Sequence, residues 1–365
     1  MRILDRHILT ELIGPFFFGV AAFTSLMFAG RELFKLTQLL AEYGASPFLL
    51  LKLMLLHLPS LIVLTLPMAM LLCSLLGFGR LSGDSEIIAL FASGISMYRI
   101  AAPVVVMAVV VTGLSFVLNE IVVPETNTLH EQTIRKFTKE PVTETKPVLV
   151  LDASNGVTNS VIYIQGGFNP ETRTMRDVAL IQYLNNKPAL FVYGKEAHWK
   201  GGNEWTFKDG YTKNIGLSEL GGHSVTMVFR DSRTVEINKT PDQISLFQKK
   251  YDQLSFSQLK KFIQMLKAEG QNVNEFRVRL YQKISIPLTC LVFALIGTPL
   301  GLRPHRSSSA MGLGLAIVII LAYWLLMDYM SVLGSNGTIE PAAASFIPTL
   351  VGMAAGIGLV ARASK

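Results

Sequence analysis

The chain has 365 residues, of which 50% are hydrophobic and only 16% are charged. Soluble domains carry about 25% charged residues, so this composition excludes an ordinary soluble protein. The net charge of +7 does not indicate nucleic acid, because Lys and Arg are scattered or lie beside apolar segments. Cys73 and Cys290 both lie within apolar runs, which excludes a disulfide framework.

Six apolar segments are long enough to cross the roughly 30 Å hydrocarbon core of a bilayer as helices, which takes about 20 residues. They are 12–30, 48–76, 100–123, 280–302, 310–332 and 342–361. The second is predicted to be one long helix, kinked at Pro59 and Pro67. The first is too long for the apolar region of a signal peptide, so we expect it to be retained.

Basic residues near the ends of these segments predict the orientation, because Lys and Arg are retained on the cytoplasmic side. They are Arg2, Arg6, Arg80, Arg99, Arg303, Arg306, Arg362 and Lys365. All of them fall on one face of the membrane if the six segments are right. Both termini are therefore predicted to be cytoplasmic, with the long stretch 124–276 on the opposite face.

The stretch 124–276 has the pattern of a β domain. Turn signals such as GGFNPET, YLNNKPA and WKGGNEW separate short β-rich runs. The runs are 148–151, 161–165, 178–183, 189–193 and 224–229. We expect a β-sandwich or jelly roll of roughly 100 residues.

Apolar residues repeat at helical spacing from Leu259 to Leu266, which predicts an amphipathic helix over 257–269. Ser257 is its expected N-cap and Gly270 its stop. The predicted organisation is three membrane helices in 1–123, a β domain with its amphipathic helix in 124–276, and three more membrane helices in 277–365. A further short helix is expected at about 80–97.

The sequence lacks the motifs of several enzyme classes. It contains no GxxxxGK[ST] phosphate loop, no HExxH and no CxxC, so we expect no catalytic residue, metal or cofactor, and no nucleotide hydrolysis by this chain. Ionisable groups within membrane segments can form ion relays, and His57 and Asp328 are the nearest candidates. Both lie toward the outer ends of their segments, which favours a bond to a neighbouring helix or a side chain that reaches the interface.

The connection GRLSGDSEIIALFASGISMY, residues 79–98, predicts a short helix between the second and third segments. Ser82 or Asp84 is its expected N-cap, Gly94 its stop, and Ile87, Ile88 and Phe91 share one face. A membrane subunit needs such a helix to receive movement from a separate ATPase. An interfacial amphipathic helix has the same pattern, and the residues alone leave both interpretations open.

Arg31 and Lys35 follow the first segment four residues apart, so on a continuing helix they share a face. Paired cations at this position would bind a phosphorylated glycolipid through charge-assisted hydrogen bonds. The competing interpretation is interfacial anchoring, with Glu32 and Glu42 as local partners.

Two long motifs resemble those of the LptF/LptG permeases of lipopolysaccharide export. GRLSGDSEIIALFASGIS is similar to that family's coupling-helix signature, and FALIGTPLGLRPHRSSSAMGLGLAI with the following YWLL is similar to its connection between the fourth and fifth helices. The N-terminal LDRHILTELIGPF is similar too. The resemblance extends from end to end and implies an α-helical inner-membrane protein with six transmembrane helices and an inserted periplasmic β-jelly roll.

The resemblance also implies partners and a mechanism. Two permease chains, paralogues or identical copies, enclose a cavity that a cytoplasmic LptB-like ATPase dimer closes, driving lipopolysaccharide out of the membrane. The jelly roll then passes the lipid to a periplasmic bridge of LptC- and LptA-like proteins. The first, second and fifth helices are expected to line the cavity, and no nucleic acid partner is implied.

Matching the motifs residue by residue implies site residues. Glu86 stands where the coupling-helix acidic residue meets the ATPase, and it is flanked by Arg80, Asp84 and Ser85. Arg31 and Lys35 match basic positions that face the lipid phosphates. The motifs imply no role for His57 or Asp328, and they do not distinguish an F-type chain, a G-type chain and a single chain serving as both.

Two other functions are alternatives. An ion-driven secondary transporter usually has inverted repeats and helices broken near the midplane, and neither is clear in this sequence. A membrane-anchored scaffold or sensor would bind a periplasmic ligand through its β domain. Such a scaffold would not need a cytoplasmic ATPase.

Overall fold

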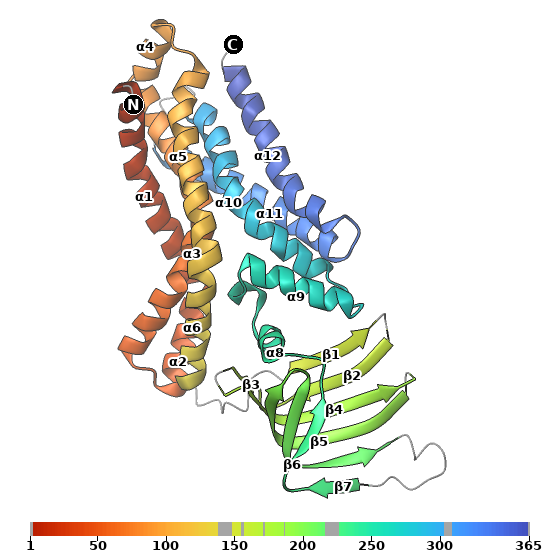
Figure 1. The fold of residues 1–365 in the computed structure, drawn as a ribbon. Coiled ribbons are helices and arrows are strands. Elements are labelled where there is room, and N and C mark those ends of the chain that lie inside the picture. The colour runs from red at the N-terminus through yellow and green to blue at the C-terminus, as the bar shows by residue number, and fades with distance from the viewer. Residues whose placement is uncertain are drawn as a thin grey trace. The chain divides into compact units, whose positions relative to one another are not determined.

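Along the sequence, the strands of an antiparallel sheet come after one set of long helices and before a second set (Figure 1). The computed structural model describes residues 3–137, 148–154, 157–170, 172–185, 187–215, 226–302 and 309–363. The chain divides into a helical unit, Met1–His130 with Asn274–Lys365, and a β domain, Glu131–Val273.

The described residues contain six helices that are long and apolar enough to cross a membrane. They are α1 (Ile3–Arg31), α3 (Pro47–Gly83), α5 (Met97–Val117) with its continuation, α10 (Asn274–Gly301), α11 (Ser309–Ser335) and α12 (Pro341–Ala363). The six predicted spans are confirmed. Each helix is longer than its apolar run, because hydropathy marks only the part that would lie in hydrocarbon. The short helices α2 (Leu33–Tyr43) and α4 (Glu86–Ala92) follow α1 and α3.

Prolines lie inside α1, α3, α5, α10 and α12 without ending these helices. α3 is one helix with Pro59 and Pro67 inside it, as predicted. α5 passes through a π-helical turn, Leu118–Val122, into α6 (Val123–Phe137). The turn stands before Pro124, whose nitrogen carries no proton for the usual hydrogen bond, and a local π-helical turn lets the helix continue beyond residue 123.

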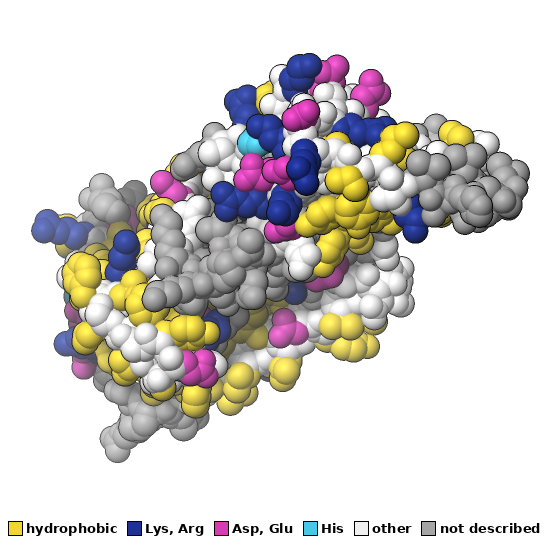
Figure 2. Space-filling view, turned by 90° about the horizontal axis from the view of Figure 1, so that it is seen from below, with side chains coloured by type: hydrophobic (Ala, Val, Ile, Leu, Met, Phe, Trp, Pro, Cys, Tyr) yellow, Lys and Arg dark blue, Asp and Glu magenta, His cyan; other side chains and the backbone are white. Residues whose placement is uncertain are grey.

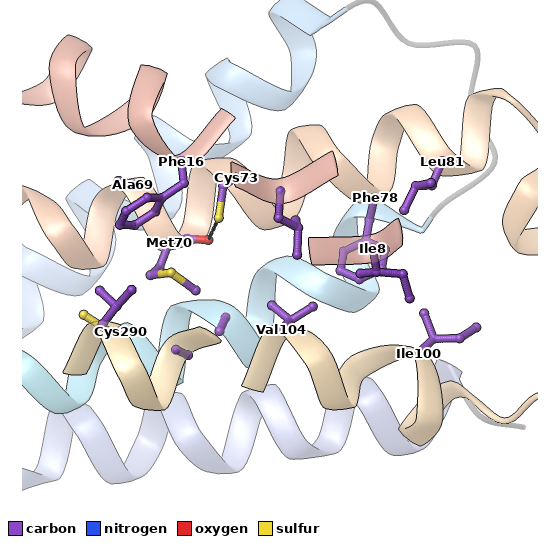
Figure 3. Packing of buried hydrophobic residues seen from close by; sticks show 14 of the residues in the cluster. Ile8, Phe16, Ala69, Met70, Cys73, Phe78, Leu81, Ile100, Val104 and Cys290 are labelled. Carbon is purple, nitrogen blue, oxygen red and sulfur yellow. Dashed lines mark hydrogen bonds between the residues drawn. The ribbon is translucent and has the colours of Figure 1, made fainter. Parts of the chain in front are cut away.

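α3 is the centre of the helical unit. In its most apolar window 83% of the residues are buried, and α3 contributes to both apolar clusters of the unit. Figure 3 shows how side chains of α1, α3, α5 and α10 meet in the first cluster. Small residues allow the close approach of helices that membrane proteins need, and Gly19, Gly77, Gly297 and Gly301 lie at such contacts.

Gly297→Ala is expected to destabilise the chain by about 1–3 kcal/mol, the usual cost of overpacking a filled core. A Cβ at this position would lie 2.7 Å from Ser74 Cβ and 3.1 Å from the Leu71 carbonyl oxygen of α3. Thermal unfolding of the detergent-solubilised chain measures the effect. Gly113→Ala in α5 is the matched control, because nothing lies within 4 Å of its Cβ; equal melting temperatures for the two variants would contradict the prediction.

The β domain is built on an antiparallel sheet in the order β1-β2-β4-β5-β6-β7, with β3 paired to β4 and β8 paired to β6. The strands are β1 (Val148–Ser154), β2 (Val157–Ile164), β3 (Phe168–Asn169), β4 (Thr174–Leu184), β5 (Lys187–Gly201), β6 (Glu204–Asn214), β7 (Thr226–Phe229) and β8 (Arg233–Glu236). Val150, Ile162, Leu180 and Val192 stand in one row across four strands and are fully buried. This row forms part of the apolar core of the domain.

Three of the predicted strand runs fall within β1, β4 and β5, and the run 161–165 extends one residue beyond β2. The fifth falls on β7 except for residues 224 and 225, which lie outside the described residues. The sequence missed β6, whose residues EWTFKDGYTKN are mostly polar. Its Trp205 and Phe207 are nevertheless fully buried. Hydrogen bonding to β5 and β8 therefore stabilises β6 as a strand, although its own composition does not indicate one.

Two helices follow the sheet, α8 (Pro241–Gln248) and α9 (Phe256–Ala268). α9 is the predicted amphipathic helix, and its apolar residues are buried as expected. The predicted N-cap Ser257 is wrong: Ser255 caps the helix through a reciprocal pair of hydrogen bonds with Gln258. A capping box requires Glu or Gln three residues after the N-cap. Gln258 follows Ser255 at this spacing, whereas Lys260 follows Ser257. Gly270 ends the helix with φ of 75°, as predicted.

Candidate functional site

The connection between α3 and α5, residues 80–99, is called here the α4 connector. α3 extends to Gly83, where the Asp84 N–H donates to the Arg80 carbonyl and the Ser85 N–H donates to the Ser82 carbonyl. Asp84 therefore ends α3, and neither Ser82 nor Asp84 caps α4, which corrects the prediction. The N-cap is Ser85, whose φ of 62° makes the turn between the helices very tight. Gly94, with φ of 81°, follows the C-cap Ser93 and stops α4, as predicted.

α4 has one anchoring side chain and two exposed ones. Ile87 is 2% exposed, whereas Ile88 and Phe91 are 57% and 41% exposed. The three residues were predicted to share a face, but only Ile87 packs into the helical unit. The two exposed apolar side chains are available for another molecule.

The charged residues of the α4 connector pair with the first turns of α1. Glu86 Oε2 lies 2.8 Å from His7 Nε2, and Arg80 Nη1 lies 3.3 Å from Glu11 Oε2. Arg99 Nη2 lies 2.7 Å from Asp5 Oδ1. These three α1 partners were not predicted as site residues, although the N-terminal motif that carries the family resemblance contains them.

A second group of charged side chains lies at the other end of α1. Arg31 is the last residue of α1, and its side chain lies outside the described part of the structure. Lys35 Nζ donates to Glu32 Oε1 at 3.0 Å, and His57 Nε2 of α3 lies 3.4 Å from the same oxygen. The His57 and His130 rings are 5.2 Å apart. We call Glu32, Lys35, His57 and His130 the cationic cluster.

The carboxylate of this cluster is buried and its lysine is exposed: the Glu32 side chain is 5% exposed and that of Lys35 is 67% exposed. Burial raises the pKa of Glu32, but the hydrogen bond from Lys35 and the charges of His57, Lys35 and His130 outweigh it and hold the pKa below its usual value. Glu32 is therefore a fixed negative charge surrounded by groups that bind anions. Among the residues described, no group of three His, Cys, Asp or Glu has the geometry of a metal site.

The contacts of the charged residues in this region differ in part from those expected. Glu32 is a local partner of Lys35, as the anchoring interpretation proposed, whereas Glu42 accepts a hydrogen bond from Gln38. The helix carrying Arg31 does not continue to Lys35, because Glu32 separates α1 from α2. His57 contacts neighbouring helices, while Asp328 is exposed on α11. The cluster was not visible in the sequence, since its members come from three distant segments.

The β domain carries a second row of apolar and aromatic residues on the face opposite its buried row, and these residues are partly or largely exposed. Leu149, Tyr163, Ala179, Tyr193, Tyr211 and Val228 are paired one to the next across six strands. Leu149 and Val228 are among the exposed large hydrophobic residues, at 54% and 77%. The space-filling view of Figure 2 shows hydrophobic side chains gathered beside charged ones on the face that it presents.

The sequence is similar to one protein family and to named members of that family. The family described as "Lipopolysaccharide export system permease LptF/LptG" matches residues 6–362. The lipopolysaccharide export system permease protein LptG of Escherichia coli K12 is 26% identical over 259 residues, which cover 69% of this chain and 68% of that protein. LptG of Haemophilus influenzae is 23% identical over 295 residues, which cover 78% of each.

Proposed function

The chain belongs to the LptF/LptG family of lipopolysaccharide export system permeases, and from that premise we propose that it is one of two permease chains that lift lipopolysaccharide out of the inner membrane. It is a multi-pass membrane protein and a permease subunit, not an enzyme. In this proposal a separate cytoplasmic ATPase dimer of the LptB kind supplies the energy.

The observation that carries the proposal is that α4 exposes apolar side chains beside a carboxylate. Ile87 anchors the helix, while Ile88 and Phe91 point their apolar surface away from the chain and the Glu86 side chain remains 43% exposed. A carboxylate beside exposed apolar residues suits a basic and apolar groove on a partner protein. We propose that Glu86 contacts the ATPase, and that Arg80, Asp84 and Ser85 hold the turn that presents it.

The proposed orientation follows from counting spans. α4 lies between the second and third spans, so it is on the same side as the N-terminus, and the β domain follows the third span on the other side. Arg80 and Arg99 at the ends of the α4 connector favour the cytoplasm for that side. The other basic residues used for orientation include Arg2, Arg303, Arg306 and Lys365, which lie outside the described residues. We propose cytoplasmic termini and a periplasmic β domain.

The cationic cluster then lies on the periplasmic side, where α1 leads into α2. We propose that Arg31 and Lys35, together with His57 and His130, bind the phosphates of the lipid. Charge-assisted hydrogen bonds to a phosphate can replace the contacts that Lys35 and His57 now make with Glu32. The exposed apolar row of the β domain offers a surface for acyl chains, since each buried methylene contributes roughly 0.8 kcal/mol.

Two of the membrane helices are largely exposed and can face a second permease chain. In the apolar windows of α1 and α11 only 22% of the residues are buried, which supports these two helices as the wall of a cavity shared with a second permease chain. The expectation that the second span also lines this cavity has little support, because its window is 83% buried. We propose that the β domain hands the lipid to an LptC/LptA-like bridge.

Glu86→Lys is expected to abolish co-purification of the ATPase with the detergent-solubilised chain after mild crosslinking, because reversing this charge places like charges at the contact. Glu86→Ala should weaken recovery less. His7→Ala is the matched control, since it breaks the same internal ion pair but keeps the Glu86 carboxylate.

Loss of the ATPase with Glu86→Lys and recovery with His7→Ala would support the proposed contact. Equal recovery with both variants would remove Glu86 from the ATPase contact. If the folded native chain recovers no ATPase, the scaffold or sensor alternative takes the place of the exporter.

A further inference from the structure

We infer that α1 is the relay between the α4 connector and the cationic cluster, and that Asp5, His7 and Glu11 are positioning residues that make α4 and α1 move together. The inference rests on the proposed function, because it assumes that an ATPase moves α4. It assigns a role to α1 residues that are not themselves proposed to contact the ATPase or the lipid phosphates, although His7 and Glu11 pair with Glu86 and Arg80 of the proposed ATPase contact.

The α4 connector is attached to α1 by charge at three points. His7 and Glu11 are four residues apart, so they lie on one flank of α1, where they meet Glu86 and Arg80. Asp5 lies elsewhere on the helix surface and meets Arg99 at the start of α5. The connector is therefore paired with the first turns of α1 at its beginning through Arg80, near its middle through Glu86, and at its end through Arg99.

The Asp5–Arg99 pair is the most protected of the three. Its side chains are 17% and 32% exposed, compared with 47% and 43% for His7 and Glu86. Exposed pairs contribute little because water and salt screen them, whereas partly buried pairs are screened much less. Asp5–Arg99 is therefore the contact whose loss should matter most.

Apolar packing joins the same elements. Ile87, the buried residue of α4, lies in one cluster with Ile8 and Leu12 of α1 and with Ile100 of α5. Ile8 and Leu12 are both 0% exposed, and Figure 3 shows Ile8 near Phe78 of α3 and Ile100 on the facing helix. Moving α4 away from α1 would uncover these side chains, so the two helices are held together by packing as well as by charge.

α1 can carry the movement to its other end. It is one helix from Ile3 to Arg31, a length of roughly 43 Å at 1.5 Å per residue. Along its length α1 packs closely against α3. A Cβ at Gly19 would lie 3.1 Å from Ala69 Cα, and the buried hydroxyls of Thr24 and Thr65 are 2.9 Å apart.

The far end of α1 leads directly into the cationic cluster. The Glu32 N–H donates to the Phe28 carbonyl of α1, and the Glu32 side chain pairs with Lys35 and His57. A displacement of the first turns of α1 would therefore move the groups proposed to hold the phosphates. This continuity is what distinguishes a relay from a local brace of α4.

A charge-swap experiment on the Asp5–Arg99 pair tests the relay in the complete ATPase complex, reconstituted in vesicles that contain lipopolysaccharide. Three quantities are compared among native, Asp5→Arg, Arg99→Asp and the double swap: ATPase recovered, lipopolysaccharide bound without ATP, and lipopolysaccharide released per ATP hydrolysed. Melting temperatures identify any variant that fails to fold, and Asp5→Asn is the milder replacement for that case.

Each single reversal is expected to lower release per ATP by at least about fivefold, the lower end of typical coupling between sites, with ATPase recovery and bound lipid unchanged. The double swap should restore release, which a merely missing charge would not explain. Unchanged release in the single variants, loss of ATPase recovery in parallel with release, or no restoration by the double swap would each overturn the relay. Failure of the native complex to hydrolyse ATP or release lipid would instead refute the proposed function.

Discussion

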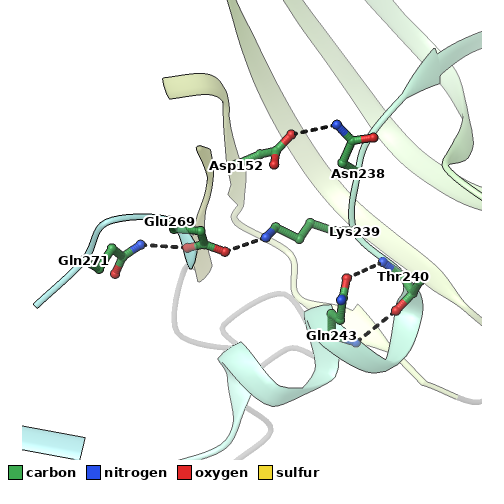
Figure 4. A network of polar contacts seen from close by, with 7 residues as sticks. All are labelled: Asp152, Asn238, Lys239, Thr240, Gln243, Glu269 and Gln271. Carbon is green, nitrogen blue, oxygen red and sulfur yellow. Dashed lines mark hydrogen bonds and ion pairs between the residues drawn. The ribbon is translucent and has the colours of Figure 1, made fainter. Parts of the chain in front are cut away.

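Lys239→Ala is expected to lower the free energy of unfolding of the β domain by about 3–5 kcal/mol, the usual cost of breaking a buried ion pair from one side. Lys239 Nζ lies 2.5 Å from Glu269 Oε1, and the two side chains are only 8% and 2% exposed. Figure 4 shows this pair between Gln271, which donates to Glu269, and the Asn238–Asp152 hydrogen bond. Removing the amine would leave the Glu269 carboxylate buried without its cation.

The pH dependence of this variant follows from the pKa of Glu269. Burial raises this pKa above its usual value even though Lys239 opposes the shift, and removing Lys239 would raise it further. A carboxyl whose pKa is higher in the folded state takes up a proton on folding, so stability falls as pH rises through that range. The loss in Lys239→Ala should therefore be smallest in acid, where Glu269 is protonated in both states, and should grow toward neutral pH.

Thermal unfolding of the detergent-solubilised chain at several pH values, followed by tryptophan fluorescence, measures this effect. Trp205 is a local probe, since its indole N–H donates to the Lys239 carbonyl. Lys200→Ala is the control for losing an ion pair at the surface, because Lys200 and Glu204 are 66% and 51% exposed. The pair replacement Lys239→Met with Glu269→Leu should recover most of the stability. A loss in Lys239→Ala no larger than in Lys200→Ala would show that the pair is not a buried one.

Lys35→Glu is expected to weaken binding of lipopolysaccharide by about 10- to 150-fold, the equivalent of losing a hydrogen bond to a charged group. Reversal at Lys35 also leaves two carboxylates, Glu32 and the new one, in contact with the bound phosphate. Arg31→Glu should weaken binding in the same direction. Glu32→Gln should strengthen lipopolysaccharide binding, because the Glu32 carboxylate pairs with Lys35 and His57 and so competes with a phosphate for them. No unfolding is expected, since the Lys35 side chain is 67% exposed.

Binding to the purified chain measures these effects, with lipopolysaccharide compared against the same lipid after removal of its phosphates. Lys52→Glu is the matched control, because Lys52 is an exposed lysine of α3 five residues before His57. The variants should differ for the phosphorylated lipid and agree for the other. Unchanged binding and delivery in both Arg31→Glu and Lys35→Glu would remove the phosphate assignment.

The sequence by itself determined the elements that depend on local composition. Six long apolar runs predict six spans because a helix that crosses hydrocarbon must be apolar along its length. Gly94 and Gly270 predict where α4 and α9 stop, because a helix commonly ends at a residue with positive φ. Short β-rich runs between turn signals predict β1, β2, β4 and β5, whereas β6 is too polar to be recognised without its neighbours.

Only the tertiary structure decided which charged residues meet. Glu32, His57 and His130 lie on segments far apart in the sequence, and helix packing brings them together. The same holds for Asp5 with Arg99 and for His7 with Glu86. A charged residue in a sequence indicates only that a partner or water is needed. The side chain that provides it depends on how α1, α3 and α5 pack, and that packing is set by close contacts such as Gly19 against Ala69, which the pattern of a single helix does not contain.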